Sequence, residues 1–121
     1  MAATMLKHLS LETEVFAAGT IVPPEREGKA VSTISQKGST VMFEIGLDMT
    51  KNIVRGLTPQ MIEDADRVIV MGPTSNPLPE YLHTSPKLEK WDVPDPGRGD
   101  ITHADARDII QSKIKDLVKE L

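Results

Sequence analysis

A short run of apolar, β-branched residues most constrains how this chain can fold. Residues 67–71 read Arg-Val-Ile-Val-Met and are followed at once by Gly72-Pro73, two residues that end regular structure. A continuous apolar run of this length fits a strand that is buried on both faces, as the strands of a parallel sheet are. The run therefore predicts a strand at 67–71 in a largely parallel sheet.

Two further segments have the composition of strands. Residues 14–18 read Glu-Val-Phe-Ala-Ala before Gly19-Thr20, and residues 88–93 read Leu-Glu-Lys-Trp-Asp-Val before Pro94. Each is short, apolar at its centre and stopped by residues that favour turns. We therefore expect three parallel strands, near residues 14–18, 67–71 and 88–93.

Helix signals alternate with these strands. Residues 2–9 place apolar residues on one face, Ser39 is a candidate N-cap for a helix ended by Gly46, and Thr58-Pro59 is a strong helix start. A further helical turn is expected around 78–82. The clearest helix is the last one, whose apolar residues recur at helical spacing: Ala106, Ile109, Ile110, Ile114, Leu117, Val118 and Leu121. Strands alternating with helices predict an α/β fold with helices on both faces of the sheet.

Length and charge exclude several classes of protein. The chain has 121 residues, which predicts a single domain, and its formal net charge is -4. A net negative charge argues against sequence-independent binding of nucleic acid, because that binding needs a basic face. No apolar run approaches the roughly 18 residues of a membrane span, and no signal peptide is recognisable. The expectation is a cytoplasmic protein that binds neither nucleic acid nor membrane.

The chain contains no cysteine, so disulfides and thiolate metal sites are excluded. The histidines, His8, His83 and His103, do not have metal-ligand spacing, and we expect surface positions for them, no metal site and no cofactor. Arg98 and Arg107 could meet an anion, although pairing of Arg107 with Asp105 or Asp108 is the simpler interpretation. The methionines at 42, 49, 61 and 71 are expected to fill the core.

Three groups of motifs, in this order and spacing, resemble the low-molecular-weight protein tyrosine phosphatase family and its arsenate reductase branch. They are Phe-Ala-Ala-Gly-Thr at 16–20; Glu-Ile-Gly-Leu-Asp-Met-Thr at 44–50 with Leu-Thr at 57–58 and 65–71; and Trp-Asp-Val-Pro-Asp-Pro at 91–96 leading into 106–110. The resemblance covers the chain from Met1 to Leu121. It implies a phosphotyrosine-phosphatase-I-like three-layer sandwich around a parallel sheet.

The resemblance also implies a site. In the family a Cys-x5-Arg loop between the first strand and the first helix holds the oxyanion, and an Asp-Pro late in the chain supplies a general acid. Asp95 matches that general acid, although Asp-Pro-Gly is also ordinary turn chemistry. The family helix that follows the loop matches residues from Met1-Ala2 onward. The chain is therefore expected to be a single domain over 1–121, N-terminally incomplete, with about three strands and without the catalytic loop.

Two functions of different classes remain open. One is a phosphatase or arsenate reductase whose catalytic loop lies upstream of Met1, so that the chain is inactive as it stands. The other is a degenerate family member that acts as a binding or regulatory domain. Reading the genomic sequence upstream of Met1 discriminates them. The lack of cysteine favours phosphatase over arsenate reductase, and Gly97, where family phosphatases often carry tyrosine, puts phosphotyrosine selectivity in question.

What remains of the site predicts two kinds of partner. The first helix should begin within the first few residues and leave backbone amides of Ala2 and Ala3 without partners, which favours weak binding of phosphate or another small oxyanion near Asp95. The strand missing from the sheet would lie between 14–18 and 67–71. We therefore expect either direct pairing of those two strands, or a homo-oligomer that pairs through exposed strand edges.

Overall fold

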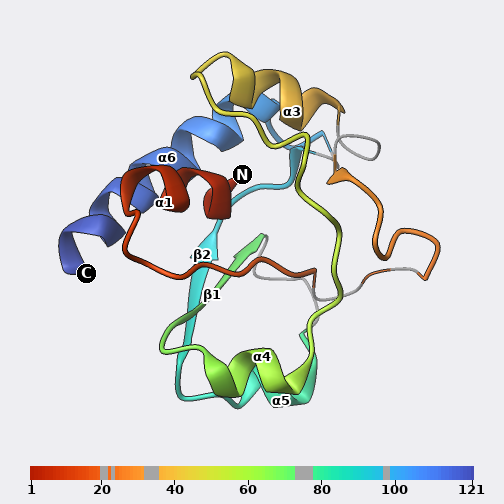
Figure 1. The fold of residues 1–121 in the computed structure, drawn as a ribbon, viewed down its shortest axis with the longest axis vertical. Helices are drawn as coiled ribbons and strands as arrows, with labels where there is room; N and C mark the ends of the chain where they lie inside the picture. The colour runs from red at the N-terminus through yellow and green to blue at the C-terminus, as the bar shows by residue number, and fades with distance from the viewer. Residues whose placement is uncertain (20–21, 23, 32–35, 73–77, 97–98) are drawn as a thin grey trace.

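A two-stranded parallel sheet lies at the centre of the molecule (Figure 1). The computed structural model describes residues 1–19, 22, 24–31, 36–72, 78–96 and 99–121. Strand β1 (Val68–Gly72) pairs with strand β2 (Leu88–Asp92), from Val68 opposite Leu88 to Gly72 opposite Asp92. The α/β fold with a parallel sheet is confirmed, as are the strands predicted at 67–71 and 88–93.

The strand predicted at 14–18 is wrong. These residues form neither a helix nor a strand, and Phe16 is 69% exposed. Gly19, just beyond them, makes only an isolated parallel bridge with Gly56. A strand needs a neighbouring strand to take its backbone hydrogen bonds, and among the described residues β1 pairs with β2 alone. The expected direct pairing of 14–18 with 67–71 therefore does not occur.

The helices lie largely where the sequence predicts them. Their bounds are α1 Ala2–Leu9, α3 Gln36–Phe43, α4 Pro59–Asp64, α5 Glu80–His83 and α6 His103–Glu120. Ser39 is not an N-cap, because α3 already includes Gln36 and Ser39 is a buried residue within the helix. None of the helices in the described part of the chain is long and apolar enough to cross a membrane.

Local capping explains several helix ends. The Thr58 hydroxyl accepts a hydrogen bond from the Met61 N–H at 3.4 Å, and Pro59 occupies the first helical position of α4. After α3 the Leu47 N–H donates to the Met42 carbonyl and the Gly46 N–H to the Phe43 carbonyl. This is the Schellman arrangement, and it requires the positive φ of 79° that Gly46 adopts. The stop predicted at Gly46 is confirmed.

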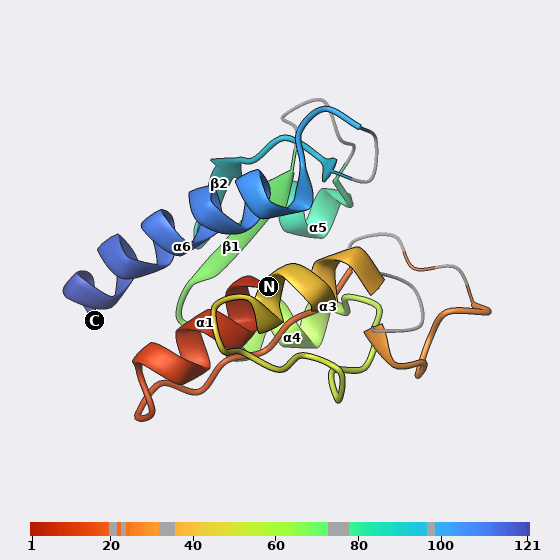
Figure 2. The ribbon, with the colours of Figure 1, turned by 90° about the horizontal axis from the view of Figure 1, so that it is seen from above.

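The main core lies where α1, α3 and α6 meet the sheet. Helix α6 packs against both α1 and α3 (Figures 1 and 2), while α4 and α5 pack together at the other end of the strands. The buried residues of this core are Met5, Met42, Met49, Val93, Ala106, Ile110, Ile114 and Leu117. Met42 and Met49 thus fill the core as predicted, and Met71 packs against it from β1.

The two strands differ in their outer edges. The Val68 N–H donates to the Lys87 carbonyl at 3.3 Å, and main-chain groups alternate sides along a strand, so those of Ile69 and Met71 point away from β2. Strand β1 carries no charge, whereas β2 contains Glu, Lys and Asp. Charged residues are typical of edge strands and protect them from pairing. The composition of β1 is therefore typical of an interior strand, although among the described residues it has only β2 as a neighbour.

Candidate functional site

Asp95 lies directly beyond the carboxyl end of β2. It is half-buried, and Val93, two residues earlier, is a core residue with 4% exposure. Ligand sites of open α/β sheets lie outside the carboxyl ends of the strands, so Asp95 occupies the end of the sheet where such sites form. Gly97 and Arg98, which the sequence analysis also considered, lie outside the described residues.

Ala2 and Ala3 form the first turn of α1, as predicted. Met1 occupies the N-cap position without a side-chain cap, so the amides of this turn lack the partner that a Ser or Asp would supply. The turn is anchored, because Met1 and Ala2 pack against the core and Asn52 Nδ2 donates to the Thr4 hydroxyl at 2.8 Å. Burial lowers the pKa of the Met1 α-amino group below its ordinary value near 8.0.

These two parts of the predicted site share one core. The start of α1 and the Val93 segment that leads to Asp95 both contact the cluster formed with α6. The first turn of α1 and the segment after β2 are therefore both anchored to the same hydrophobic core. That Asp95 faces the amides of Ala2 and Ala3 stays a prediction.

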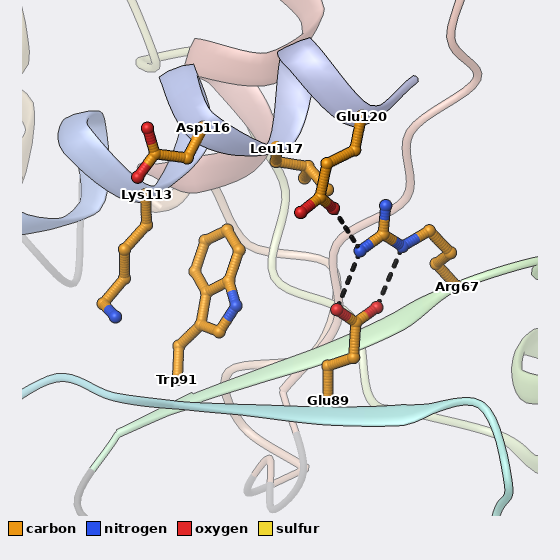
Figure 3. A pocket seen from close by; sticks show the side chains of 7 residues that line it. All are labelled: Arg67, Glu89, Trp91, Lys113, Asp116, Leu117 and Glu120. Carbon is orange, nitrogen blue, oxygen red and sulfur yellow. Dashed lines mark hydrogen bonds and ion pairs between the residues drawn. The ribbon is translucent and has the colours of Figure 1, made fainter.

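A hollow of about 200 Å³ opens elsewhere, between α6 and the sheet (Figure 3), and Asp95 does not line it. Its lining residues are Arg67, Glu89, Trp91, Lys113, Asp116, Leu117 and Glu120. Glu89 and Trp91 are two residues apart on β2, so their side chains lie on the same face of the sheet. This is the face that α6 covers. No sequence motif connects the residues of this hollow, so it could not be predicted from the sequence.

Arg67 joins three elements at this hollow. Its Nε and Nη2 donate to both oxygens of Glu89 at 2.9 and 2.8 Å, and Nη2 also donates to Glu120 Oε2 at 2.9 Å. The hydrogen bonds from Arg67 lower the pKa of the Glu89 carboxyl, and those to Glu89 and Glu120 raise the pKa of Arg67. Bidentate pairing of this kind fixes geometry, so it holds the start of β1 to β2 and to the end of α6.

Among the described residues, Arg107 pairs with acidic side chains and links α6 to α3, so its guanidinium is already occupied and is not directed at an anion site. Its guanidinium donates to Asp108 at 3.0 Å, which confirms the predicted pairing, and also to Glu44 at 3.2 Å. A further bond to the Val41 carbonyl, at 2.8 Å, joins α6 to α3. The contacts with Val41 of α3 and with Glu44, one residue beyond α3, have no signal in the sequence pattern.

The three histidines do not form a cluster in the structure. His8 and His83 are exposed, as expected for surface residues, and His103 is half-buried at the first residue of α6. Among the residues described, no three His, Cys, Asp or Glu side chains are grouped so that they could hold a metal ion.

The comparison of folds assigns the architecture. No protein-family model matches the chain. Among solved structures, the chain is similar to Vibrio vulnificus Wzb in complex with benzylphosphonate, with a TM-score of 0.78 and 19% sequence identity over 99% of this chain and 88% of that chain. The fold is that of the low-molecular-weight tyrosine phosphatases. Because identity is 19%, the likeness to Wzb establishes the fold alone.

The ion pair of Glu89 predicts a loss of stability in acid. Its pKa is lowered in the folded protein, so its contribution is present above the unfolded pKa, about 4.3, and is lost as the pH falls through the lower folded value. The pair is partly exposed, so the contribution should not exceed about 1 kcal/mol. In urea unfolding, the difference between the chain and Glu89→Gln should therefore be larger at pH 7 than at pH 3. Glu12→Gln, at an exposed position, is the control, and equal pH dependence of both variants would contradict the prediction.

Proposed function

We propose that this chain is a low-molecular-weight tyrosine phosphatase domain of the cytoplasm that lacks the family's first strand and cysteine loop and is inactive as it stands. The observation that carries the proposal is the pairing of this fold, over 99% of the chain, with a sequence that contains no cysteine. An aryl phosphate hydrolysis assay tests it, and no rate above that of buffer is expected.

The chemistry of phosphoryl transfer supports this proposal. A covalent route needs an activated nucleophile, together with donors arranged around the three equatorial oxygens of the transferred group. Of these parts, the chain supplies a helix N-terminus at Ala2 and Ala3 and, at Asp95, a carboxyl in the general-acid position that the resemblance implies. A general acid and one helix end do not replace a nucleophile.

The retained helix end supports binding of a small oxyanion. Amides at the start of α1 and the helix dipole favour anions. Wzb, which shares the fold, was solved with benzylphosphonate. Titration with phosphate, followed by NMR amide shifts, should move Ala2, Ala3 and Asp95 with a dissociation constant in the millimolar range, which corresponds to about -4 kcal/mol.

The Met1 amine provides a pH test of the same site. The amine is positive only below its pKa, which burial has lowered, so sulfate should bind more tightly at pH 6 than at pH 9. Sodium chloride at matched ionic strength is the control for screening. Shifts confined to residues far from 2–5 and 95–96, or identical shifts with chloride, would rule out an oxyanion site here.

Self-association through β1 is a further part of the proposal. The uncharged strand and the outward-facing main-chain groups of Ile69 and Met71 support pairing with a second copy of the chain. Sedimentation velocity from low to high micromolar concentration should show a growing dimer fraction. Val70→Lys should abolish it by placing a charge on the edge, while Val70→Thr should keep it. A monomer at every concentration would refute self-association through β1. It would leave the proposed lack of phosphatase activity unaffected.

A further inference from the structure

Trp91 presents its ring to the hollow between α6 and the sheet, and a cation already stands over it. Lys113 Nζ lies 5.8 Å from the ring centroid, near the outer limit of about 6 Å for a useful cation–π contact. In the part of the chain that the structure describes, this is the one interaction of the Lys113 ammonium. The ring is thus a favourable place for a cation, and its present occupant is weakly held and replaceable.

Two carboxylates beside the Trp91 ring, those of Asp116 and Glu120, have oxygens that can still accept hydrogen bonds. Arg67 takes both oxygens of Glu89 but only Oε2 of Glu120. Glu120 Oε1 and the exposed Asp116 carboxylate have no hydrogen-bond or ion-pair partner among the described residues. Figure 3 shows Asp116 beside Lys113 on α6 and Glu120 on the other side of Trp91. The lining carries three carboxylates against two cations, so it favours a positive ligand.

We propose that this hollow binds a guanidinium group, such as the end of an arginine side chain on a peptide, which displaces Lys113 from Trp91 and pairs with Asp116 on the same side of the ring. A guanidinium is planar and stacks on an indole ring, and its fork of N–H donors matches carboxylates. Its weaker hydration lowers the cost of leaving water compared with an ammonium. The site shares no residue with the proposed oxyanion site, so either proposal can fail alone.

The probe is Nα-acetylarginine amide, and Trp91 is its reporter. The chain has one tryptophan, so a change in tryptophan emission reports on this ring alone. We expect saturable quenching with half-saturation at about millimolar concentration. Nα-acetylcitrulline amide has the same shape without the charge and should leave the emission unchanged. Equal quenching by the citrulline compound would overturn the proposal.

Two lysines of α6 provide matched variants. Lys113→Met removes the competing cation from the ring and should strengthen binding about two- to fivefold, the range of an exposed cation–π contact. Lys115→Met removes the same charge at an exposed position outside the hollow and should leave binding nearly unchanged. An equal gain in both would show a general charge effect, and a loss in Lys113→Met would assign Lys113 to ligand binding. Either result would overturn the proposal.

Asp116→Asn tests the carboxylate side of the site. Because Asp116 is exposed and makes no contact that holds the described fold, the variant should fold normally, and its unfolding curve checks this. Binding of the arginine compound should weaken about two- to threefold, as for a partly solvated ion pair. Unchanged binding in this variant together with unchanged binding in Lys113→Met would place the ligand elsewhere.

Discussion

Purified protein should hydrolyse an aryl phosphate no faster than buffer. The chain contains no cysteine, and loss of a catalytic nucleophile commonly lowers the rate by on the order of 10⁴ or more. The general-acid role proposed for Asp95 would not compensate, since a general acid protonates a leaving group and forms no bond to phosphorus. A low-molecular-weight tyrosine phosphatase assayed alongside gives the scale of an intact enzyme.

The Asp95→Ala variant separates two outcomes of that assay. If the chain is inactive, the variant should match it within error, and circular dichroism should show that both are folded. A robust rate of hydrolysis that drops in Asp95→Ala would mean that a side chain other than cysteine acts as nucleophile. This result would contradict the proposed function. A robust rate that the variant leaves unchanged would indicate a contaminating phosphatase, which a second purification route would remove.

Ile114→Ala should produce the largest loss of stability. Ile114 is 2% exposed at the centre of α6, in the cluster that joins this helix to α1, α3 and the sheet. Truncating a fully buried isoleucine removes apolar contacts and leaves a cavity, and it typically costs about 2–5 kcal/mol. Small domains have only about 5–15 kcal/mol in total, so the midpoint of urea unfolding should fall strongly.

Leu121→Ala is the matched control, because it also truncates an apolar side chain of the C-terminal segment. Leu121 is 56% exposed, so the change should stay within about 0.5 kcal/mol. Ile114→Val, with a typical cost of about 0.5–1.5 kcal/mol, keeps the comparison measurable if the alanine variant does not fold. Equal losses in Ile114→Ala and Leu121→Ala would contradict the position of the core.

The features that the sequence predicted correctly are those encoded over a few neighbouring residues. The β-branched run became β1, the apolar spacing from Ala106 became α6, and Thr58-Pro59 became the start of α4. Each depends on periodicity or on a cap, and both act within about one turn of helix or one strand length. Asp95 was found through the resemblance, and the structure places it after β2.

The segment at 14–18 shows why such patterns can fail. Its composition suits a strand, yet Phe16 is largely exposed and the segment forms no ladder. Backbone hydrogen bonds of a strand come from another segment, so strand propensity without a neighbour does not produce a strand. The outcome at 14–18 therefore depends on the rest of the sheet and not on its own residues.

By itself, the sequence determined the α/β class, the position of two strands and of the main helices, and the absence of a cysteine nucleophile. Only the tertiary structure decided which charged side chains meet. Arg67 contacts partners 22 and 53 residues away, and Arg107 reaches a carbonyl 66 residues away. The parallel register of β1 with β2 and the packing of α6 create these contacts and the Trp91 hollow. Local patterns carry no signal for them, because a side chain's distant neighbours are set by how whole elements pack.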